Sequence, residues 1–251
     1  MYYYIMEPPK GKIATRQEKI KDILGDLGIA GETVSSSAAR TIEELTHLGI
    51  VKGYSTVVAV GGEALVNKII TVLATEKTAK DVVLGVIPNE FDSILARKIN
   101  IHDIRSACSA LKFRRLESID LCSIEPNRYF ITEALIENNR NYPIYFSKDN
   151  LQGKITADRI LIKPGLEIFT HDRSLEGNTP SKFYRWLFGK KPDDIFSSYF
   201  TAKKIRFEAE NNAAIPVKVS DEVVAKTPVT IQSRSKVLKI IVARDKIKEE
   251  N

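Results

Sequence analysis

The sequence lacks several features that would place it in a familiar class. No apolar stretch approaches the roughly 20 residues that a membrane-spanning helix needs, and the start MYYYIMEPPK has neither the basic residues nor the apolar run of a signal peptide. The 251 residues include two cysteines and three histidines, none at Cys-x-x-Cys or metal-ligand spacing. These absences argue against a disulfide framework and a zinc site. We expect a cytoplasmic protein whose cysteines are buried thiols.

The composition is that of a globular protein with a moderate excess of positive charge. Hydrophobic residues make up 43% and charged residues 28%, which at this length supports a substantial core in one large or two smaller domains. The 38 lysines and arginines exceed the 32 acidic residues, so the net charge is +6. This balance favours anionic partners such as nucleotides, nucleic acid or acidic lipid surfaces without selecting among them.

The first hundred residues alternate between strand-like and helix-like patterns. Apolar residues at helical spacing predict three helices, over 16–29, 39–53 and about 64–73. Short apolar runs predict three strands, over 2–6, 56–60 and 82–87. This alternation predicts a Rossmann-like parallel sheet with helices on both faces, and ligands of such sheets bind at the carboxyl ends of the strands.

From about residue 112 the pattern becomes β-rich. Seven short segments are punctuated by glycine, proline and asparagine, and several alternate apolar and polar side chains as half-buried antiparallel strands do. The segments are 118–136, 142–148, 153–169, 202–210, 214–220, 227–233 and 236–244. We therefore predict an α/β domain over 1–111, a β-sandwich-like domain over 112–243 and a solvated tail over 244–251.

Five segments resemble, in the right order, motifs of the diacylglycerol kinase catalytic-domain family, which includes bacterial diacylglycerol kinases and sphingosine kinases. They are IMEPPKGK (5–12), VVAVGGEALVNKII (57–70), LGVIPNEFDSILARKINI (84–101), IDLCSIEPNRYF (119–130) and VKVSDEVVAKTPVTI (217–231). The resemblance covers nearly the whole chain and implies a two-domain lipid kinase-like fold, similar to that of NAD kinases. It also implies ATP and Mg²⁺ as cofactors and phosphoryl transfer to a lipid hydroxyl.

The resemblance places the nucleotide site at the turn that follows residue 60. Gly61, Gly62 and Asn67 match the family pattern Gly-Gly-Asp-Gly-Thr-x-Asn-Glu, Glu63 keeps a carboxylate at the aspartate position, and Lys12 matches the lysine of the opening motif. In the family, backbone N–H groups of this turn hold the ATP phosphates. A plain strand-to-helix turn also uses glycine, Asn67 can bond within its own helix, and Lys12 can be a solvated lysine, so these interpretations stay open.

The departures from the family fall on residues that would do the chemistry. Glu7 stands where asparagine is usual, Ala64 replaces a glycine, and the family's Gly-Thr-Gly-Asn-Asp is replaced by residues 90–94, EFDSI. A carboxylate about 5 Å from a phosphate charge repels it by about 3 kcal/mol at an effective dielectric constant near 20. Mg²⁺ bound by Glu63, Glu90 and Asp92 would reverse that effect, and the sequence leaves the metal ligands unassigned.

The catalytic base is ambiguous as well. The family's Asp-Gly-Glu motif aligns with Ser220-Asp221-Glu222, which leaves Asp221 and Glu222 as the candidates for the base. A shift of one residue within a strand would turn Asp221 to the opposite face, whereas a residue at a strand end could still reach the substrate. The alternative is an exposed acidic pair in a β-turn.

The segment SKFYRWLFGKK (181–191) is predicted to form a basic amphipathic helix. Phe183, Trp186 and Leu187 share one helical face, and four cations surround them. Such a helix would either lie in a membrane interface, here the inner membrane face, or pack its aromatic side against the β-rich domain. Both alternatives stay open.

The resemblance thus leads to two hypotheses from different classes. One is a divergent ATP-dependent lipid kinase with eroded motifs, and the other is a pseudokinase that binds lipid or nucleotide without catalysis. A nucleic-acid binder is a third hypothesis, supported only by the pI near 9.1. A homodimer is compatible with the sequence but is not specified by it.

Overall fold

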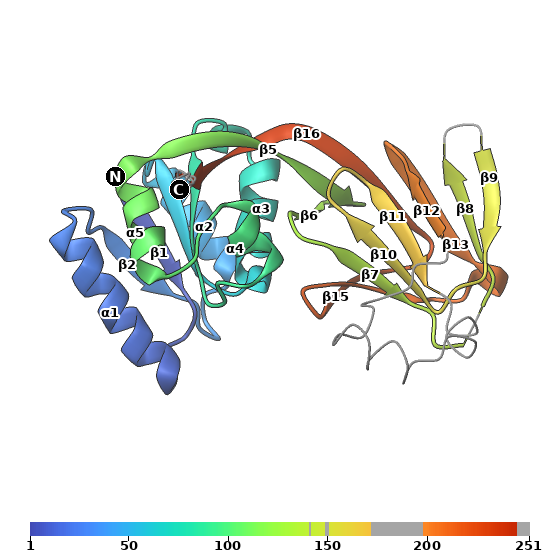
Figure 1. Cartoon of the computed structure of the whole chain (residues 1–251), viewed down its shortest axis with the longest axis horizontal. Helices are drawn as coiled ribbons and strands as arrows, with labels where there is room; N and C mark the ends of the chain where they lie inside the picture. Colours follow the sequence, from blue (N-terminus) through green and yellow to red (C-terminus); the bar gives the residue numbers. More distant parts are fainter. Residues whose placement is uncertain (141, 149–150, 172–197, 245–251) are drawn as a thin grey trace, which may run out of the picture. The chain divides into compact units, whose positions relative to one another are not determined.

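The protein consists of two compact units (Figure 1). A computed structural model describes residues 1–140, 142–148, 151–171 and 198–244. The first unit holds Met1–Leu121 and the chain from Ser235 onward, and the second holds Cys122–Arg234. The predicted helix at 181–191 and all but the first residue of the predicted tail lie outside the described residues.

Five parallel strands form the sheet of the first unit. In spatial order they are β2 (Glu32–Ser35), β1 (Tyr2–Met6), β3 (Thr56–Gly61), β4 (Val83–Pro88) and the last part of β16 (Val229–Val242). Every residue of β3 and β4 is buried, because a strand covered on both faces has no solvent side and reads as a continuous apolar run. The predicted Rossmann-like parallel sheet is confirmed.

Helices cover both faces of this sheet (Figure 1). They pack in two pairs, α1 (Lys12–Asp26) with α5 (Ile104–Phe113) and α2 (Ile42–Val51) with α3 (Glu63–Thr75). Thr41 and Asp103 begin α2 and α5 with capping boxes, which satisfy backbone N–H groups that a helix N-terminus leaves unpaired. Two short elements complete the unit, the 3-10 helix η1 (Lys77–Ala79) after α3 and α4 (Ile94–Lys98) after β4.

The second unit contains two antiparallel sheets. One has the order β12-β11-β10-β7-β14-β15, and the other runs from the first part of β16 through β13 and β8 to β9, with the β5–β6 hairpin beside β16. The strands are β5 (Arg115–Ile124), β6 (Arg128–Phe130), β7 (Ala134–Glu137), β8 (Ile144–Lys148), β9 (Leu151–Ile155), β10 (Arg159–Lys163), β11 (Glu167–His171), β12 (Ser198–Thr201), β13 (Lys204–Ala209), β14 (Pro216–Val219) and β15 (Glu222–Lys226). Buried apolar side chains from both sheets form one cluster, as the predicted sandwich requires.

The division into units differs from the predicted domains in two places. The chain leaves the first unit after Leu121, not at residue 111. The reason is that most of β5, which begins at Arg115, belongs to the first unit, and only the end of this strand belongs to the second. The predicted strands 227–233 and 236–244 are one strand, β16, whose last part pairs with β4 through Ile240 and Leu84. The polar stretch SRSK (233–236) looks like a break in sequence, but the strand continues through it with a positive φ of 52° at Lys236.

Both cysteines are buried and neither forms a disulfide, as predicted. Burial, aided by the charge of Asp103, raises the pKa of Cys108 to about 11, so its thiol is protonated and unreactive at neutral pH. No helix within the described ranges is long and apolar enough to cross a membrane.

Candidate functional site

Three loops follow the carboxyl ends of β1, β3 and β4. They are the segment after Met6, the Gly61-Gly62 turn and the loop after Pro88. The backbone joins them, because the N–H of Glu7 donates to the carbonyl of Val60 at 3.3 Å and the N–H of Asn89 donates to the carbonyl of Gly61 at 3.1 Å. Parallel sheets bind their ligands at this edge, so the predicted phosphate turn has the expected position in the fold.

The side chain of Glu7 contacts the glycine turn directly. Its Oε1 accepts the N–H of Gly62 at 2.7 Å, and its Oε2 accepts from Nδ2 of Asn89, also at 2.7 Å. The main-chain carbonyl of Glu7 accepts from Nε2 of Gln17 at 2.7 Å, which fixes the backbone of the loop. Hydrogen bonds from an amide to a carboxylate are short and about twice as strong as neutral ones. A carboxylate therefore holds the N-cap N–H of α3, a donor of the kind that phosphates use.

Gly61 provides the room for this contact. A Cβ at Gly61 would lie 2.7 Å from Oε1 of Glu7 and 2.9 Å from its Cδ, whereas a Cβ at Gly62 would find its nearest neighbour at 3.4 Å. The first distance is too short for a real Cβ and the second is an ordinary contact. The absence of a side chain at position 61 is thus required by the approach of Glu7, a reason for this glycine that the sequence did not reveal.

Glu63 links the glycine turn to the next loop. It is the first residue of α3, where a negative charge is stabilised by the helix dipole. Its Oε1 accepts the N–H of Leu95 in α4 at 3.3 Å. Ser93 caps the same short helix by accepting the N–H of Ala96 at 3.2 Å. The carboxylate that the family resemblance assigns to nucleotide or metal binding is therefore hydrogen-bonded to the protein's own backbone.

Arg16 of α1 holds the loop after β4 in place. Its guanidinium donates to the carbonyl of Pro88 at 2.6 Å and to the carbonyl of Asn89, and its Cζ lies 4.9 Å from the centroid of the Phe91 ring. Burial lowers the pKa of Arg16, and the nearby Glu7 carboxylate opposes that shift. In the part of the chain that the structure describes, the buried Nε of Arg16 has no hydrogen-bond partner.

Asn67 and Lys12 are the other predicted nucleotide contacts. Asn67 lies within α3 and is only 7% exposed, and Lys12 is an exposed residue at the start of α1. Their contacts with ATP stay predictions. Glu90 and Asp92 are exposed, and the described residues include no group of three or more acidic, histidine or cysteine side chains placed to hold a metal ion. The Mg²⁺ ligand set suggested by Glu63, Glu90 and Asp92 does not fit this arrangement.

The two candidates for the base belong to the second unit. Ser220 and Asp221 have positive φ values of 49° and 63° and connect β14 to β15, where Val219 pairs with Glu222. Two successive positive φ values in a two-residue connection define a type I′ hairpin turn. Asp221 and Glu222 are both exposed. The backbone matches the β-turn alternative, and a catalytic role for either residue stays a prediction.

Sequence reasoning missed three residues of the network. It noted Glu7 as a departure from asparagine but assigned it no contact, and it assigned nothing to Arg16 or Asn89. The two partners of the Glu7 carboxylate are 55 and 82 residues away along the chain, so no local pattern marks them. The available signal was a carboxylate on a longer side chain at a position where the family places an amide.

Comparisons with known proteins agree with this fold. No curated protein matches the chain, whereas a family model described as the diacylglycerol kinase catalytic domain matches residues 3–124. Two Bacillus anthracis structures, provisionally assigned as diacylglycerol kinases, are 14% and 15% identical, with TM-scores of 0.77 and 0.75. The alignments cover 96% of this chain in both cases and 96% and 97% of those chains.

A further structure from the same organism, a diacylglycerol kinase, has a TM-score of 0.73 at 14% identity and 96% coverage of both chains. At such identities the likeness concerns the fold of both units, while the family model concerns the residues that carry the glycine turn. The region 3–124 is therefore similar to the diacylglycerol kinase catalytic domain, and the likeness of the whole chain to the solved structures is one of fold.

Proposed function

We propose that this protein is a pseudokinase, which keeps the architecture of a lipid kinase as a binding module without ATP-dependent catalysis. The observation that carries the proposal is the Glu7 carboxylate on the N–H of Gly62 at 2.7 Å. ATP-dependent phosphoryl transfer requires this turn to receive phosphate oxygens, and here the turn receives an acidic side chain of the protein itself.

The electrostatic consequence follows from the charge of Glu7. Phosphoryl transfer depends on positioning and on compensation of the phosphate charges. A phosphate charge about 5 Å from the Glu7 carboxylate would be repelled by about 3 kcal/mol at an effective dielectric constant near 20, which is about a hundredfold in affinity. Arg16 offers limited compensation, because two of its donors already bind the carbonyls of Pro88 and Asn89.

The positions of the two candidate bases support the same proposal. A general base must come within hydrogen-bond reach of the hydroxyl from which it takes a proton, and its surroundings usually tune its pKa. Asp221 and Glu222 are exposed residues at a hairpin turn. An exposed carboxylate in a turn is common on protein surfaces and by itself indicates no catalytic role.

The second candidate function is an ATP-dependent lipid kinase that uses Mg²⁺. It is favoured by the Gly61-Gly62 turn, which stands at the N-terminus of α3, and by the buried Nε donor of Arg16, which has no partner among the described residues. For this candidate the Glu7 side chain must leave Gly62 before phosphate enters. The two functions therefore predict different ATP affinities for the wild type, in which the Glu7 charge is present.

The test is calorimetric titration of the full chain with ATP, with and without Mg²⁺. We expect no detectable binding by the wild type at millimolar ATP, and an affinity about a hundredfold higher in Glu7→Asn, which restores the family residue and removes the repulsion. Glu18→Gln is the matched control, because Glu18 is exposed on α1 and the change removes the same charge. It should bind ATP no better than the wild type.

A lipid assay completes the test. Vesicles that contain diacylglycerol, supplied with Mg²⁺ and ATP, should yield no phosphorylated lipid with the wild type. Micromolar, Mg²⁺-dependent ATP binding by the wild type together with phosphorylation of the lipid would overturn the proposal and establish the kinase.

A further inference from the structure

Lysines surround the end of α3 that lies opposite the glycine turn. A hollow of about 290 Å³ lies there, and every residue that lines it belongs to the first unit. The end of α3, the η1 segment, Val82 just before β4 and one residue of β5 form part of the lining, and β16 completes it. Four lysines take part, Lys77 and Lys80 from around η1 and Lys236 and Lys239 from β16.

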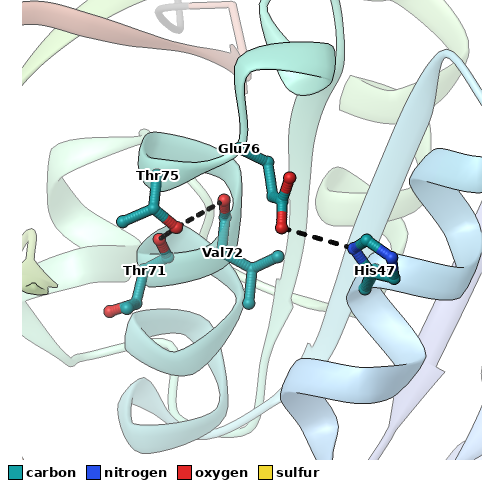
Figure 2. A network of polar contacts seen from close by, with 5 residues as sticks. All are labelled: His47, Thr71, Val72, Thr75 and Glu76. Carbon is teal, nitrogen blue, oxygen red and sulfur yellow. Dashed lines mark hydrogen bonds and ion pairs between the residues drawn. The ribbon is translucent and has the colours of Figure 1, made fainter.

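The charge of this hollow is strongly positive. Glu76 is the one carboxylate among the residues that line it, and its Oε1 faces Nδ1 of His47 in α2 at 3.3 Å, as Figure 2 shows. Within the described ranges, no carboxylate forms an ion pair with any of the four lysines. Like charges gathered in one concavity repel one another and raise the local concentration of anions.

Hydroxyl groups also line the hollow. Ser118 of β5 contributes one, and Thr75 contributes another, whose Oγ1 donates to the carbonyl of Thr71 at 2.8 Å (Figure 2). Because the one hydroxyl hydrogen of Thr75 is used within α3, Ser118 is the hydroxyl to which we assign a hydrogen bond with an anion.

The helix dipole explains only half of this cluster. Cations close to the C-terminus of a helix are favoured by its dipole, which accounts for Lys77 and Lys80 after α3. It does not account for Lys236 and Lys239, which a different strand brings to the same hollow from the far end of the chain. The meeting of the two pairs is a property of the tertiary fold.

The backbone of β16 is irregular at Lys236, one of the four lysines. Its φ is +52°, a conformation that residues with a Cβ rarely adopt. Its N–H donates to Oδ1 of Asp120 in β5 at 2.8 Å, which holds the irregular turn of the strand. The bond to Asp120 therefore fixes the backbone of Lys236 where it lines the hollow.

We propose that this hollow, bounded by Lys77, Lys80, Lys236 and Lys239, binds a small polyanion that carries phosphate groups. Lysine ammonium groups act as point charges for phosphate, and four of them suit a ligand with several negative charges. The site is separate from the glycine turn, since α3 has 13 residues, or about 20 Å at about 1.5 Å per residue. The ligand is either a free phosphorylated molecule or a phosphorylated lipid headgroup.

The experiment measures two probes on the full chain. Calorimetry with pyrophosphate tests the free ligand, and flotation with phosphatidylcholine vesicles, with and without phosphatidylinositol 4-phosphate, tests the headgroup. We expect one probe to bind the wild type in a salt-dependent manner. Lys236→Gln with Lys239→Gln should weaken that binding about tenfold or more, because two charged donors are lost. Lys77→Gln with Lys80→Gln should weaken it similarly.

The matched control is Lys19→Gln with Lys21→Gln. These two lysines are exposed on α1, so the control removes the same net charge away from the hollow and should change binding less than about twofold. Loss of pyrophosphate binding in both test variants identifies a free ligand, and loss of vesicle binding alone identifies a headgroup. Equal weakening in the control, an effect of only one lysine pair, or no binding of either probe would overturn the proposal.

Discussion

The two ends of helix α3 differ in how their charges are used. At the N-terminus, the carboxylates of Glu7 and Glu63 are hydrogen-bonded to backbone N–H groups of Gly62 and Leu95. Around the C-terminus, lysines line an open hollow, and its single carboxylate is turned toward His47. Both arrangements suit the helix dipole, which favours negative charge at the N-terminus and positive charge at the C-terminus.

The difference between the two ends shows that a helix dipole of favourable sign does not by itself make a binding site, because the protein's own side chains can use the same charge. The N-terminus of α3 has the glycine turn that resembles a phosphate-binding motif, but acidic side chains of the protein itself accept hydrogen bonds from the N–H groups of Gly62 and Leu95. The C-terminus lies beside four lysines of the hollow, for which we propose an anionic ligand. The two ends of one helix thus differ in charge, and variants of α3 and its neighbours can show how far the ends are independent.

The largest effect should come from the middle of the helix. Ile69 is fully buried in α3, and Ile69→Ala should lower the free energy of unfolding by about 2–5 kcal/mol through lost burial and the cavity left behind. Because the contacts at both ends of α3 depend on the packing of this helix, the variant should weaken the contacts at the glycine turn and those around the lysine hollow. Urea unfolding measures the effect, with the exposed Thr78→Ala in η1 as control. A loss no larger than that of the control would show that α3 is not the common support.

A smaller effect should distinguish the two glycines of the turn. Gly61→Ala places a Cβ against the Glu7 side chain, which must then move and give up its hydrogen bonds to Gly62 and Asn89, so we expect a cost of about 1–3 kcal/mol of unfolding free energy. Gly62→Ala meets only an ordinary contact and should cost clearly less. Thermal and urea unfolding of both variants provide the measurement.

A double-mutant cycle sharpens that comparison. In a Glu7→Ala background the carboxylate is gone, so the cost of Gly61→Ala should fall by most of its value, because contacting residues couple in such cycles. An unchanged cost would mean that the strain at Gly61 does not come from Glu7.

The smallest effect should come from the same substitution at both ends of the helix. Glu63→Gln removes a negative charge from the first turn of α3 and weakens a hydrogen bond to Leu95, so we expect a loss of about 0.3–1 kcal/mol. Glu76→Gln removes a charge at the C-cap, where the dipole disfavours it, and also removes an exposed pairing with His47. These effects oppose each other, so the net change should be close to zero. Equal losses at low salt would contradict the dipole argument.

Much of the first unit was predictable because its buried strands are unambiguous. The runs at 56–60 and 82–87 are apolar at nearly every position, and both appear as strands close to those bounds. β2 was not predicted, because ETVS is short and polar and only half-buried. The continuity of β16 was also missed, since SRSK resembles a turn and its left-handed residue at Lys236 is held by Asp120, a residue far away in sequence.

The position of the glycine turn was predictable from the sequence, but the group that occupies its N–H donor was not. Gly61 and Gly62 follow a buried strand, so the sequence located the turn at the correct edge of the sheet. What lies on the turn depends on the conformation of one long side chain, Glu7, and on amide groups contributed by distant loops. Composition and periodicity report which residues are present, and they do not report which donor a carboxylate selects.

The bond between Glu7 and Gly62 makes the chain a competitor of any anion that approaches this turn. Because the competing group is attached to the same molecule, dilution does not remove it, and its effective concentration is set by the chain, at about the millimolar level or above for short connections. An incoming ligand must therefore displace a tethered rival before it gains its first contact. The affinity of the turn for an anion would in this way be set by one residue of the loop after β1.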